Sequence, residues 1–318
     1  MVMIATLGEA LLRLSAPSGE RLHDAHSLDI HVGGSEANVA FALAQLGLAS
    51  SWTSVLPRNP LGRKVASTLE SGGVDISTVI WKDGGRLGTY FVEVGSHPRA
   101  TDVVYDRAGS AMSLATPDLF DWDRICQARL LHLSGITAAL SPGCAQVVER
   151  AIVEANAHDC RVSFDVNYRQ RLWPAASAAD SLRTLAPGLH VVICTMEDAR
   201  DLLGITGSAE DSVRALAEIL RVPTTVLTCG ADGAVALQGT ELCRRPGHSI
   251  TTVDRIGAGD AFAAGFLAGF LEGSVDKGLE QGLSMSALKM TLHGDLFRFS
   301  REELDAYRQS GAAREVRR

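Results

Sequence analysis

The chain has 318 residues, 46% of them hydrophobic, and a formal net charge of −7, which suits one large α/β domain with a substantial core. The acidic balance argues against nucleic acid or an anionic membrane surface as a partner, because both bind a basic protein face. No apolar stretch approaches the roughly 20 residues of a membrane span and the first residues lack the basic segment of a signal peptide, so we expect a cytoplasmic protein.

The cysteines and histidines indicate no structural metal. The six cysteines are widely scattered, with no Cys-x-x-Cys pair and no cluster with histidines at zinc spacing. We therefore expect reduced thiols that are mostly buried.

Short runs rich in Val, Ile and Leu alternate with longer helical patterns along the chain. The expected strands are residues 4–7, 130–133, 162–165, 191–194 and 225–228. The expected helices are residues 36–46, 144–157, 208–220 and 260–271. This alternation predicts a mostly parallel sheet with helices on both faces, and ligands then bind beyond the carboxyl ends of the strands.

Two segments, residues 10–32 and 86–108, interrupt this rhythm. In both, apolar and polar residues alternate, which is typical of half-exposed antiparallel strands. We expect a single domain over residues 1–318, in which these segments form a small projecting sheet that serves as a lid.

The first candidate binding motif is Gly33-Gly34-Ser35-Glu36-Ala37-Asn38, where the first lid segment ends and a helix begins. The glycines permit close approach of a ligand to the backbone, Ser35 can cap the helix, and Asn38 faces the same end one turn later. An ordinary capped turn has the same pattern, so this motif alone leaves both interpretations open.

The most informative stretch is Asp254-Arg255-Ile256-Gly257-Ala258-Gly259-Asp260, followed by an apolar run to residue 271. A Gly-Ala-Gly turn that opens into a helix leaves unpaired N–H groups at the positive end of the helix dipole, where an anion binds. Asp260 adds a carboxylate at the same place. Phosphoryl transfer needs both parts, because the amides stabilise charge on the phosphoryl oxygens and the carboxylate accepts the proton of the attacking hydroxyl.

Two better-known phosphate-binding motifs do not fit the sequence. Gly62-Arg63-Lys64 lacks the earlier glycine and the Ser or Thr of a Walker A motif, and Phe262 stands where the dinucleotide fingerprint has its third glycine. The sequence therefore disfavours P-loop and Rossmann cofactor sites.

The early Gly-Gly-x-x-x-Asn, the late Asp-x-x-Gly-Ala-Gly-Asp and the two lid segments together resemble the ribokinase or PfkB family of sugar kinases over nearly the whole chain. The resemblance implies a ribokinase-like three-layer α/β/α fold with a β-lid, and a kinase that uses ATP and Mg²⁺ to phosphorylate a primary alcohol of a small sugar. It also implies that Asp260 is the general base and that Gly257, Ala258 and Gly259 form the anion hole and contact the nucleotide. Lid strands of this fold can pair between subunits, so we expect a homo-oligomer.

Four fragments look most like the subgroup of this family that acts on 2-keto-3-deoxygluconate. They are residues 105–111, 131–136, 164–173, and 287–289 with 294–295. This resemblance implies phosphorylation of the terminal primary hydroxyl of that sugar acid to give 2-keto-3-deoxy-6-phosphogluconate. The choice between gluconate and galactonate epimers stays open, as do two alternatives: a sibling kinase for fructose, ribose or a nucleoside, and a non-catalytic sugar sensor.

A sugar acid carries a carboxylate, which a net-acidic protein has to bind with fixed guanidinium groups. Arg107 on a lid strand and Arg169 after a core strand are the candidates, although an arginine beside an Asp, like Arg107, is often only a surface ion pair. The resemblance implies further sugar contacts from the lid residues Tyr90 and Tyr105 and from the backbones of Gly34 and Ile136.

For the nucleotide, residues 228–233 end a strand in a glycine-rich turn that resembles the phosphate-side loop of the family. The resemblance implies ATP contacts from Thr228, Gly230, Asp232 and Gly233. A plain hairpin turn is an equally good interpretation. Lys289 is expected near the adenine end, with no assigned role.

Three departures from the family pattern concern ions and the sugar. Many members carry an Asn three residues before a Glu that helps to organise Mg²⁺ through water, and here Cys194 replaces the Asn while Glu197 is kept. Arg255-Ile256 replaces the usual Thr-Thr, which leaves a monovalent-cation (K⁺) site beside the turn open. Glu9 stands where several sugar kinases place a sugar-binding Asp, so neutral sugars are expected to fit less well.

Overall fold

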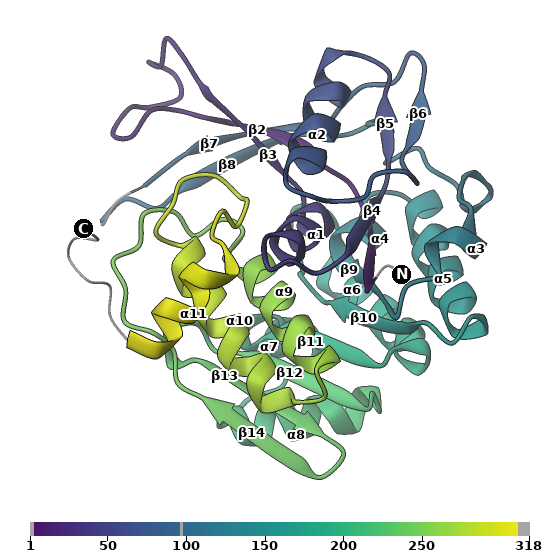
Figure 1. The fold of residues 1–318 in the computed structure, drawn as a ribbon, viewed down its shortest axis with the longest axis vertical. Helices are drawn as coiled ribbons and strands as arrows, with labels where there is room; N and C mark the ends of the chain where they lie inside the picture. The colour runs from purple at the N-terminus through teal and green to yellow at the C-terminus, as the bar shows by residue number, and fades with distance from the viewer. Residues whose placement is uncertain (1–2, 96–97, 311–318) are drawn as a thin grey trace.

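A computed structural model describes residues 3–95 and 98–310 of the chain. Its main sheet has eight strands in the order β14-β13-β12-β11-β10-β9-β1-β4 (Figure 1). The strands from β4 to β12 pair in parallel, and β13 and β14 add an antiparallel hairpin at one edge. Their bounds are β1 Ile4–Leu7, β4 Ser50–Thr53, β9 Leu130–Ser134, β10 Arg161–Asp165, β11 Val191–Thr195, β12 Thr224–Thr228, β13 Ala234–Gln238 and β14 Glu241–Arg245.

Helices cover both faces of this sheet, and each face has its own hydrophobic core cluster. One face packs against α3 Trp122–Ile125, α4 Gly135–Ala139, α5 Pro142–Ala157, α6 Ala175–Leu185, α7 Met196–Leu203 and α8 Ala209–Leu220. The other packs against α1 Ser35–Gln45, α9 Ala258–Leu271, α10 Val275–Lys289 and α11 Arg301–Ser310. This is the expected ribokinase-like three-layer α/β/α arrangement, and short 3₁₀ turns at Pro117–Leu119, Ala186–Gly188 and Gly230–Asp232 complete it.

The predicted core elements are confirmed to within two residues at each end. Strands such as β1 are buried along their whole length because helices cover both sheet faces, which is why they read as continuous apolar runs. At the start of α8 the Ser208 side chain accepts a hydrogen bond from the Asp211 N–H, as expected for a helix cap.

A second, four-stranded sheet forms from the two segments that interrupt the rhythm of the chain. Its order is β3-β2-β7-β8, with β2 Leu11–Ser15, β3 Asp29–Gly33, β7 Thr89–Glu93 and β8 Asp102–Asp106. Each segment is an antiparallel hairpin, but the central pair β2 and β7 is parallel, so the expectation of a wholly antiparallel sheet was wrong. The two hairpins pair with each other through their first strands, β2 and β7, which run in the same direction.

A small unit lies beside this second sheet (Figure 1). It contains the parallel pair β5 Val55–Pro57 and β6 Ile80–Lys82, with α2 Pro60–Ser71 between them in the chain. The side chain of Asn59 caps α2 by accepting hydrogen bonds from the Leu61 and Gly62 N–H groups.

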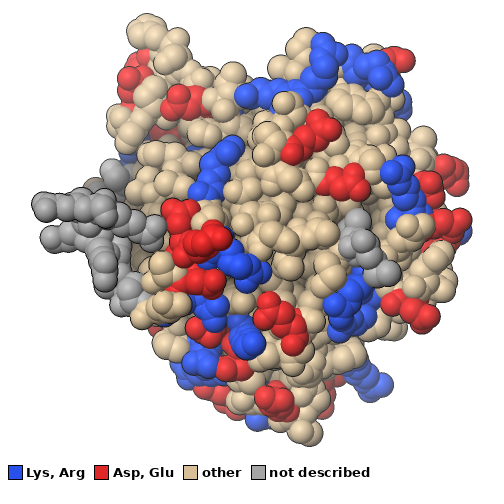
Figure 2. Space-filling view, viewed as in Figure 1, with Lys and Arg blue, Asp and Glu red and all other residues tan. Residues whose placement is uncertain are grey.

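The surface in Figure 2 intersperses basic and acidic side chains, so this face carries no broad basic area of the kind that binds nucleic acid. Within the described part of the chain, every helix is too short or too polar to cross a membrane. All six cysteines are unpaired thiols, four of them buried, as the scattered spacing predicted.

Candidate active site

The amino ends of α1 and α9 meet at the carboxyl edge of the parallel strands, and Asp260 lies between them in the first turn of α9. One carboxylate oxygen of Asp260 accepts a hydrogen bond from the Ser35 hydroxyl at 2.8 Å, and the other accepts one from the Asn38 side-chain amide at 2.7 Å. Asn167, which follows β10, donates in turn to Ser35 at 2.9 Å. Neutral donors therefore fix the Asp260 carboxylate, which forms no ion pair within the described part of the chain.

The turn before α9 has the backbone shape of an anion cradle. Gly257 is the helix N-cap and adopts a left-handed conformation (φ 83°), and a Cβ there would stand 2.1 Å from the Asp295 carbonyl oxygen. A Cβ on Gly259 would meet nothing within 4 Å, so the space above it is open to a ligand. The Ala258 N–H donates to the Arg255 carbonyl at 3.2 Å, so the prediction that all three amides are free was wrong for Ala258 in this structure.

The Gly33-Gly34 turn brings the backbone of α1 against the end of β1. Gly34 has φ 152° and a Cβ on it would lie 2.3 Å from the Glu9 carbonyl oxygen, so only glycine fits there. The expectation that Ser35 caps α1 was wrong, because Gly34 is the N-cap and the Ser35 hydroxyl is directed to Asp260. Asn38 does face the same end, as expected.

Two further carboxylates lie in this region, and one of them, Asp165, is near enough to Asp260 for their charges to interact. Asp165 ends β10 and Asp198 lies in the first turn of α7, and both are buried. Desolvation raises the pKa of Asp165 well above its usual range, and the charges of Asp260 and Asp198 raise it further. Desolvation also raises the pKa of Asp260, against the hydrogen bonds from Asn38 and Ser35. Asp165 and Asp198 were not singled out from the sequence, although their positions just after strands of a parallel sheet were a usable signal.

Glu197, predicted to organise Mg²⁺, is not part of this cluster of carboxylates. Its side chain is 77% exposed and lies 4.0 Å from Arg200. Asp198, one residue later, is buried, accepts a hydrogen bond from the Tyr168 N–H, and is near enough to Asp165 for their charges to interact. One residue turns a helical side chain by about 100°, so Glu197 faces solvent while Asp198 faces Asp165, and contact of Glu197 with Mg²⁺ through water stays a prediction.

Arg169 lies at the open side of the same cluster. Its side chain is exposed and donates to the Tyr168 carbonyl at 2.9 Å. Its positive charge opposes the rise in the pKa of Asp165, Asp198 and Asp260, which means that it is close to all three. Ile136, in the short helix α4 after β9, is half-buried at the same sheet edge.

Arg107 has a different environment from the one predicted. Its Nε donates to a Glu9 carboxylate oxygen at 2.8 Å and its Nη2 contacts the same oxygen, while the Ser110 hydroxyl donates to the other oxygen. Glu9 is 4% exposed. A substrate carboxylate at Arg107 would have to compete with this buried ion pair, so the structure does not favour the predicted role.

The two lid tyrosines stack on each other, with ring centroids 5.6 Å apart. Tyr105 is 38% exposed and lies under the Arg107 guanidinium, in keeping with a surface that a ligand can touch. The Tyr90 hydroxyl instead donates to the buried Asp295 carboxylate, and a Cβ on Gly33 would lie 2.8 Å from that hydroxyl. The hydroxyl of Tyr90 is therefore already engaged within the protein, and contact of Tyr90 with the sugar stays a prediction.

Residues 228–233 form the connection of the β12–β13 antiparallel hairpin, with the Cys229 N–H donating to the Gly233 carbonyl at 2.8 Å. Thr228 is half-buried at the strand end, whereas Gly230 and Asp232 are exposed. Gly233 has φ 97° and packs closely against the backbone of residues 245–247. The hairpin interpretation is thus confirmed, and contact with ATP from its exposed residues stays a prediction.

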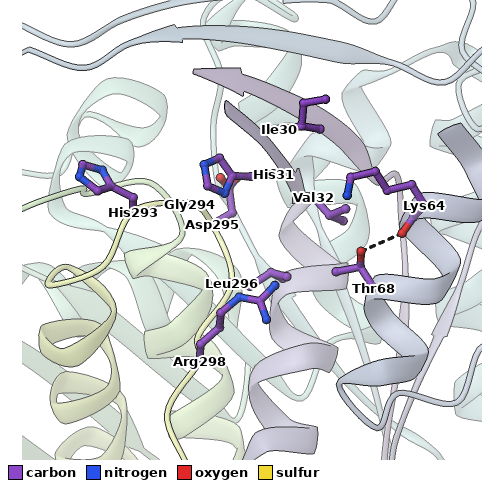
Figure 3. A pocket seen from close by; sticks show the side chains of 10 residues that line it. All are labelled: Ile30, His31, Val32, Lys64, Thr68, His293, Gly294, Asp295, Leu296 and Arg298. Atoms are coloured by element: carbon purple, nitrogen blue, oxygen red, sulfur yellow. Dashed lines mark hydrogen bonds between the residues drawn. The ribbon is translucent and has the colours of Figure 1, made fainter. Parts of the chain in front are cut away.

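A cavity of about 70 Å³ lies on the outer side of the Asp295 loop, between β3 and α2 (Figure 3). Basic side chains line it, including Lys64, Arg298, His31 and His293. It has room for a few water molecules and is too small for a sugar acid or a nucleotide. The site around Asp260 is therefore the better candidate for chemistry.

Glu36, in the first turn of α1, is buried, with 1% exposure. One of its carboxylate oxygens accepts hydrogen bonds from the Ser134 N–H, the Ser134 hydroxyl and the Thr137 hydroxyl, at 2.7–3.1 Å. These bonds tie the start of α1 to the end of β9. Desolvation nevertheless raises the pKa of Glu36 to about 7.

Glu36→Gln should flatten the dependence of stability on pH. Between the unfolded pKa of 4.5 and the folded pKa of about 7 the native state holds a proton that the unfolded chain has lost, so the unfolding free energy of the natural protein falls as the pH rises. From pH 5 to pH 8 this amounts to about 2–3 kcal/mol, at roughly 1.4 kcal/mol per pKa unit. Urea unfolding at both pH values measures it. The exposed Glu70→Gln is the control and should follow the natural slope; an equally steep slope in Glu36→Gln contradicts the assignment.

The chain is similar to known proteins along most of its length. The sequence model of the pfkB family of carbohydrate kinases matches residues 1–297. The chain belongs to the PfkB family of carbohydrate kinases. It is 38% identical to a 2-dehydro-3-deoxygalactonokinase of Haloferax volcanii over 311 residues, covering 98% of each chain. It is 34% identical to a 2-dehydro-3-deoxygluconokinase of Thermoproteus tenax, over 84% of this chain and 81% of the relative.

The crystal structure of a 2-dehydro-3-deoxygluconokinase from Thermotoga maritima is similar to the whole fold. Its TM-score is 0.90 at 34% sequence identity, with 98% of this chain and all of the other chain covered. The family resemblance seen in the motifs is thereby confirmed, and this PfkB chain is an ATP-dependent carbohydrate kinase.

Proposed function

We propose that this PfkB kinase phosphorylates the terminal primary hydroxyl of 2-keto-3-deoxygluconate, giving 2-keto-3-deoxy-6-phosphogluconate. The proposal rests on two features of the site: a carboxylate fixed by neutral donors, Asp260, and an exposed guanidinium, Arg169, near enough for its charge to lower the pKa of that carboxylate. A sugar acid matches both groups at once, with its carboxylate at Arg169 and its far hydroxyl at Asp260. The names of the similar kinases agree with a keto-deoxy sugar acid but divide between the gluconate and galactonate epimers.

The chemical step needs one proton acceptor and a set of donors for negative charge. The terminal hydroxyl gives its proton to Asp260, its oxygen bonds to the γ-phosphorus of ATP, and the bond from that phosphorus to the bridging oxygen breaks to release ADP. Amides of the Gly257–Gly259 turn stabilise the charge on the phosphoryl oxygens. A pKa of Asp260 raised above its ordinary value makes the carboxylate a stronger base for this transfer.

The residues at the site also suit Mg²⁺, which supplies positive charge to the triphosphate. The described residues contain no group of three or more His, Cys, Asp or Glu side chains placed to hold a metal. Mg²⁺ is commonly held by one or two carboxylates together with phosphate oxygens, and Asp165 and Asp198 are the carboxylates available for this.

The second sheet acts as a lid in this proposal. Its strands carry Tyr105 and the buried Arg107–Glu9 pair to the edge of the site, and closure over a bound sugar acid excludes the water that would otherwise hydrolyse ATP. Exposed apolar side chains on its two edge strands, Ile30 (52%) and Val104 (49%), are those that contact with a second subunit would cover. Homo-oligomerisation and a cytoplasmic location stay predictions.

A substrate panel tests the proposal directly. The purified enzyme with ATP and Mg²⁺ is given 2-keto-3-deoxygluconate, its galactonate epimer, fructose, ribose and a nucleoside, and ADP release is measured. We expect turnover with the keto-deoxy acids and a product phosphorylated at the terminal carbon by NMR. Preference for a neutral sugar would assign the chain to a sibling kinase, and no ADP with any acceptor would favour a sugar sensor.

Arg169→Ala should raise the KM for the sugar acid by about 10- to 100-fold, because a hydrogen bond to a charged group contributes about 1.5–3 kcal/mol. The KM for a neutral sugar should change little. Initial rates over a range of both acceptors measure the difference, and the exposed Arg200→Ala on α7 is the control. Equal effects on acid and neutral acceptors would mean that Arg169 does not bind the carboxylate.

A further inference from the structure

Lys289, the last residue of α10, is fully buried, with 0% exposure. Lysine is almost never buried without a use for its charge, because removal of an ammonium group from water is costly. Its Nζ donates to two backbone carbonyls, those of Asp254 and Leu292, at 3.3 Å each. These contacts place Lys289 beside the turn that leads to Gly257, and its expected closeness to the adenine end stays a prediction.

Those two carbonyls belong to the two segments that shape the anion cradle. Asp254 begins the turn that ends at Gly257, and its carboxylate accepts hydrogen bonds from the Ile256 N–H at 3.0 Å and the Gly294 N–H at 3.1 Å. Leu292 precedes the loop through Asp295, whose backbone carbonyl lies directly against Gly257. A bond to Leu292 alone would be ordinary helix capping, but the bond to Asp254 joins the helix end to the catalytic turn.

Two positive side chains, Arg13 and Lys289, lie near the two buried carboxylates of Asp254 and Asp295, so the charges balance. The Arg13 guanidinium, from β2, lies 2.7 Å from the Asp254 carboxylate and 3.1 Å from the Asp295 carboxylate. Lys289 adds a second positive charge to these two negative ones. Burial lowers the pKa of Lys289, and the nearby Asp254 and Asp295 oppose that by favouring the charged form.

We propose that Lys289 is a positioning residue for phosphoryl transfer, in which its ammonium acts as a built-in monovalent cation that joins the carbonyls of Asp254 and Leu292 and so fixes the turn that aims the amides of Gly257 and Gly259. Converging carbonyls are the kind of ligand that K⁺ prefers. With the ammonium in that place and the charges balanced, the enzyme needs no monovalent cation from solution. This inference rests on the proposed kinase mechanism.

The natural enzyme gives the first test, which does not depend on how any variant folds. Replacement of K⁺ and Na⁺ in the assay by tetramethylammonium should change kcat by less than about twofold, since no solution cation is recruited. A strong activation by K⁺ would overturn the proposal.

Lys289→Ala gives the second test. We expect kcat to fall about 10- to 100-fold, as for a reacting group misplaced by about 1 Å, while the KM values for ATP and sugar acid change little. Added K⁺, ammonium or ethylammonium should restore part of kcat by occupying the vacated place, which a merely structural lysine would not permit. Lys289→Met, which keeps most of the volume, should lose activity without this rescue, and the exposed Lys277→Met on the same helix is the control.

The outcomes separate the two proposals. An inactive natural enzyme with every acceptor would remove the kinase mechanism itself. An active natural enzyme with a fully active Lys289→Ala, or with a Lys289→Ala that folds but stays inactive with every added cation, would overturn only the role of Lys289. Folding of each variant is checked by circular dichroism before the rates are compared.

Discussion

Asp260→Asn should reduce kcat by about 10²- to 10⁴-fold, the contribution expected of a general base. Asparagine keeps the size of the side chain but cannot accept the proton. Its NH₂ group also faces one of the two donors, Ser35 or Asn38, so one of these hydrogen bonds is lost. The affinity for ATP should change little, because the cradle of backbone amides is retained. Steady-state rates with 2-keto-3-deoxygluconate and calorimetric titration with ATP measure the two effects.

The control for this experiment is Asp201→Asn. Asp201 is exposed on α7, so the same change from carboxylate to amide there should leave kcat unchanged. A loss of less than about tenfold in Asp260→Asn would show that another group takes the proton. Asp165 is one alternative, since it is buried and its charge interacts with that of Asp260. Comparison with Asp165→Asn then identifies the base: the larger loss, with ATP affinity retained, marks it.

Arg13→Met should lower the unfolding free energy by about 3–5 kcal/mol, the usual cost of removing one partner of a buried ion pair. The Arg13 side chain is 1% exposed and its Nη1 contacts the carboxylates of both Asp254 and Asp295. Methionine fills much of the space but leaves these buried carboxylates without the cation that contacts them directly, with Lys289 still nearby. Urea unfolding at neutral pH measures the loss.

The same variant has a predictable response to pH. Desolvation already raises the pKa of Asp295 in spite of Arg13, and the loss of the guanidinium should raise it further. A carboxyl group whose folded pKa is raised stabilises the fold at low pH and loses this effect as the pH rises, so the deficit of Arg13→Met should shrink toward pH 5.

Arg245→Met is a matched control, because Arg245 makes a similar two-pronged pair with Asp276 but both side chains are more than 40% exposed. It should cost less than about 1 kcal/mol. Equal losses in the two variants would mean that burial of the Arg13 cluster has no energetic effect.

The sequence was sufficient to predict elements whose pattern is local. Helix α9 and strand β12 were predicted because continuous apolar runs and flanking glycines mark them without reference to any partner. The parallel pairing of β2 with β7 was missed, since nothing in either strand specifies a partner more than seventy residues away. Hairpin β13–β14 was also missed, since its outer strand is only partly buried and is mostly polar.

The sequence predicted those parts of the candidate site whose residues are neighbours in the chain. Asp260 and the glycines before it follow one another in the chain, so the helix start placed them together. Arg107 was assigned to the substrate because its buried partner, Glu9, lies 98 positions earlier and cannot be recognised from spacing. Glu197 was predicted from the family pattern, whereas sequence alone does not show which face of a first helical turn is buried, so the buried Asp198 was not singled out.

The hydrogen bonds to Asp260 span 225 and 222 residues of the chain, and the loop that supports Gly257 comes still later, at Asp295. During synthesis the early parts of the site, Ser35 and Asn38, leave the ribosome long before the carboxylate that they hold. A nascent chain that stops short of residue 295 therefore lacks the support beneath its cradle, and catalysis can begin only after the chain through Asp295 has emerged and folded.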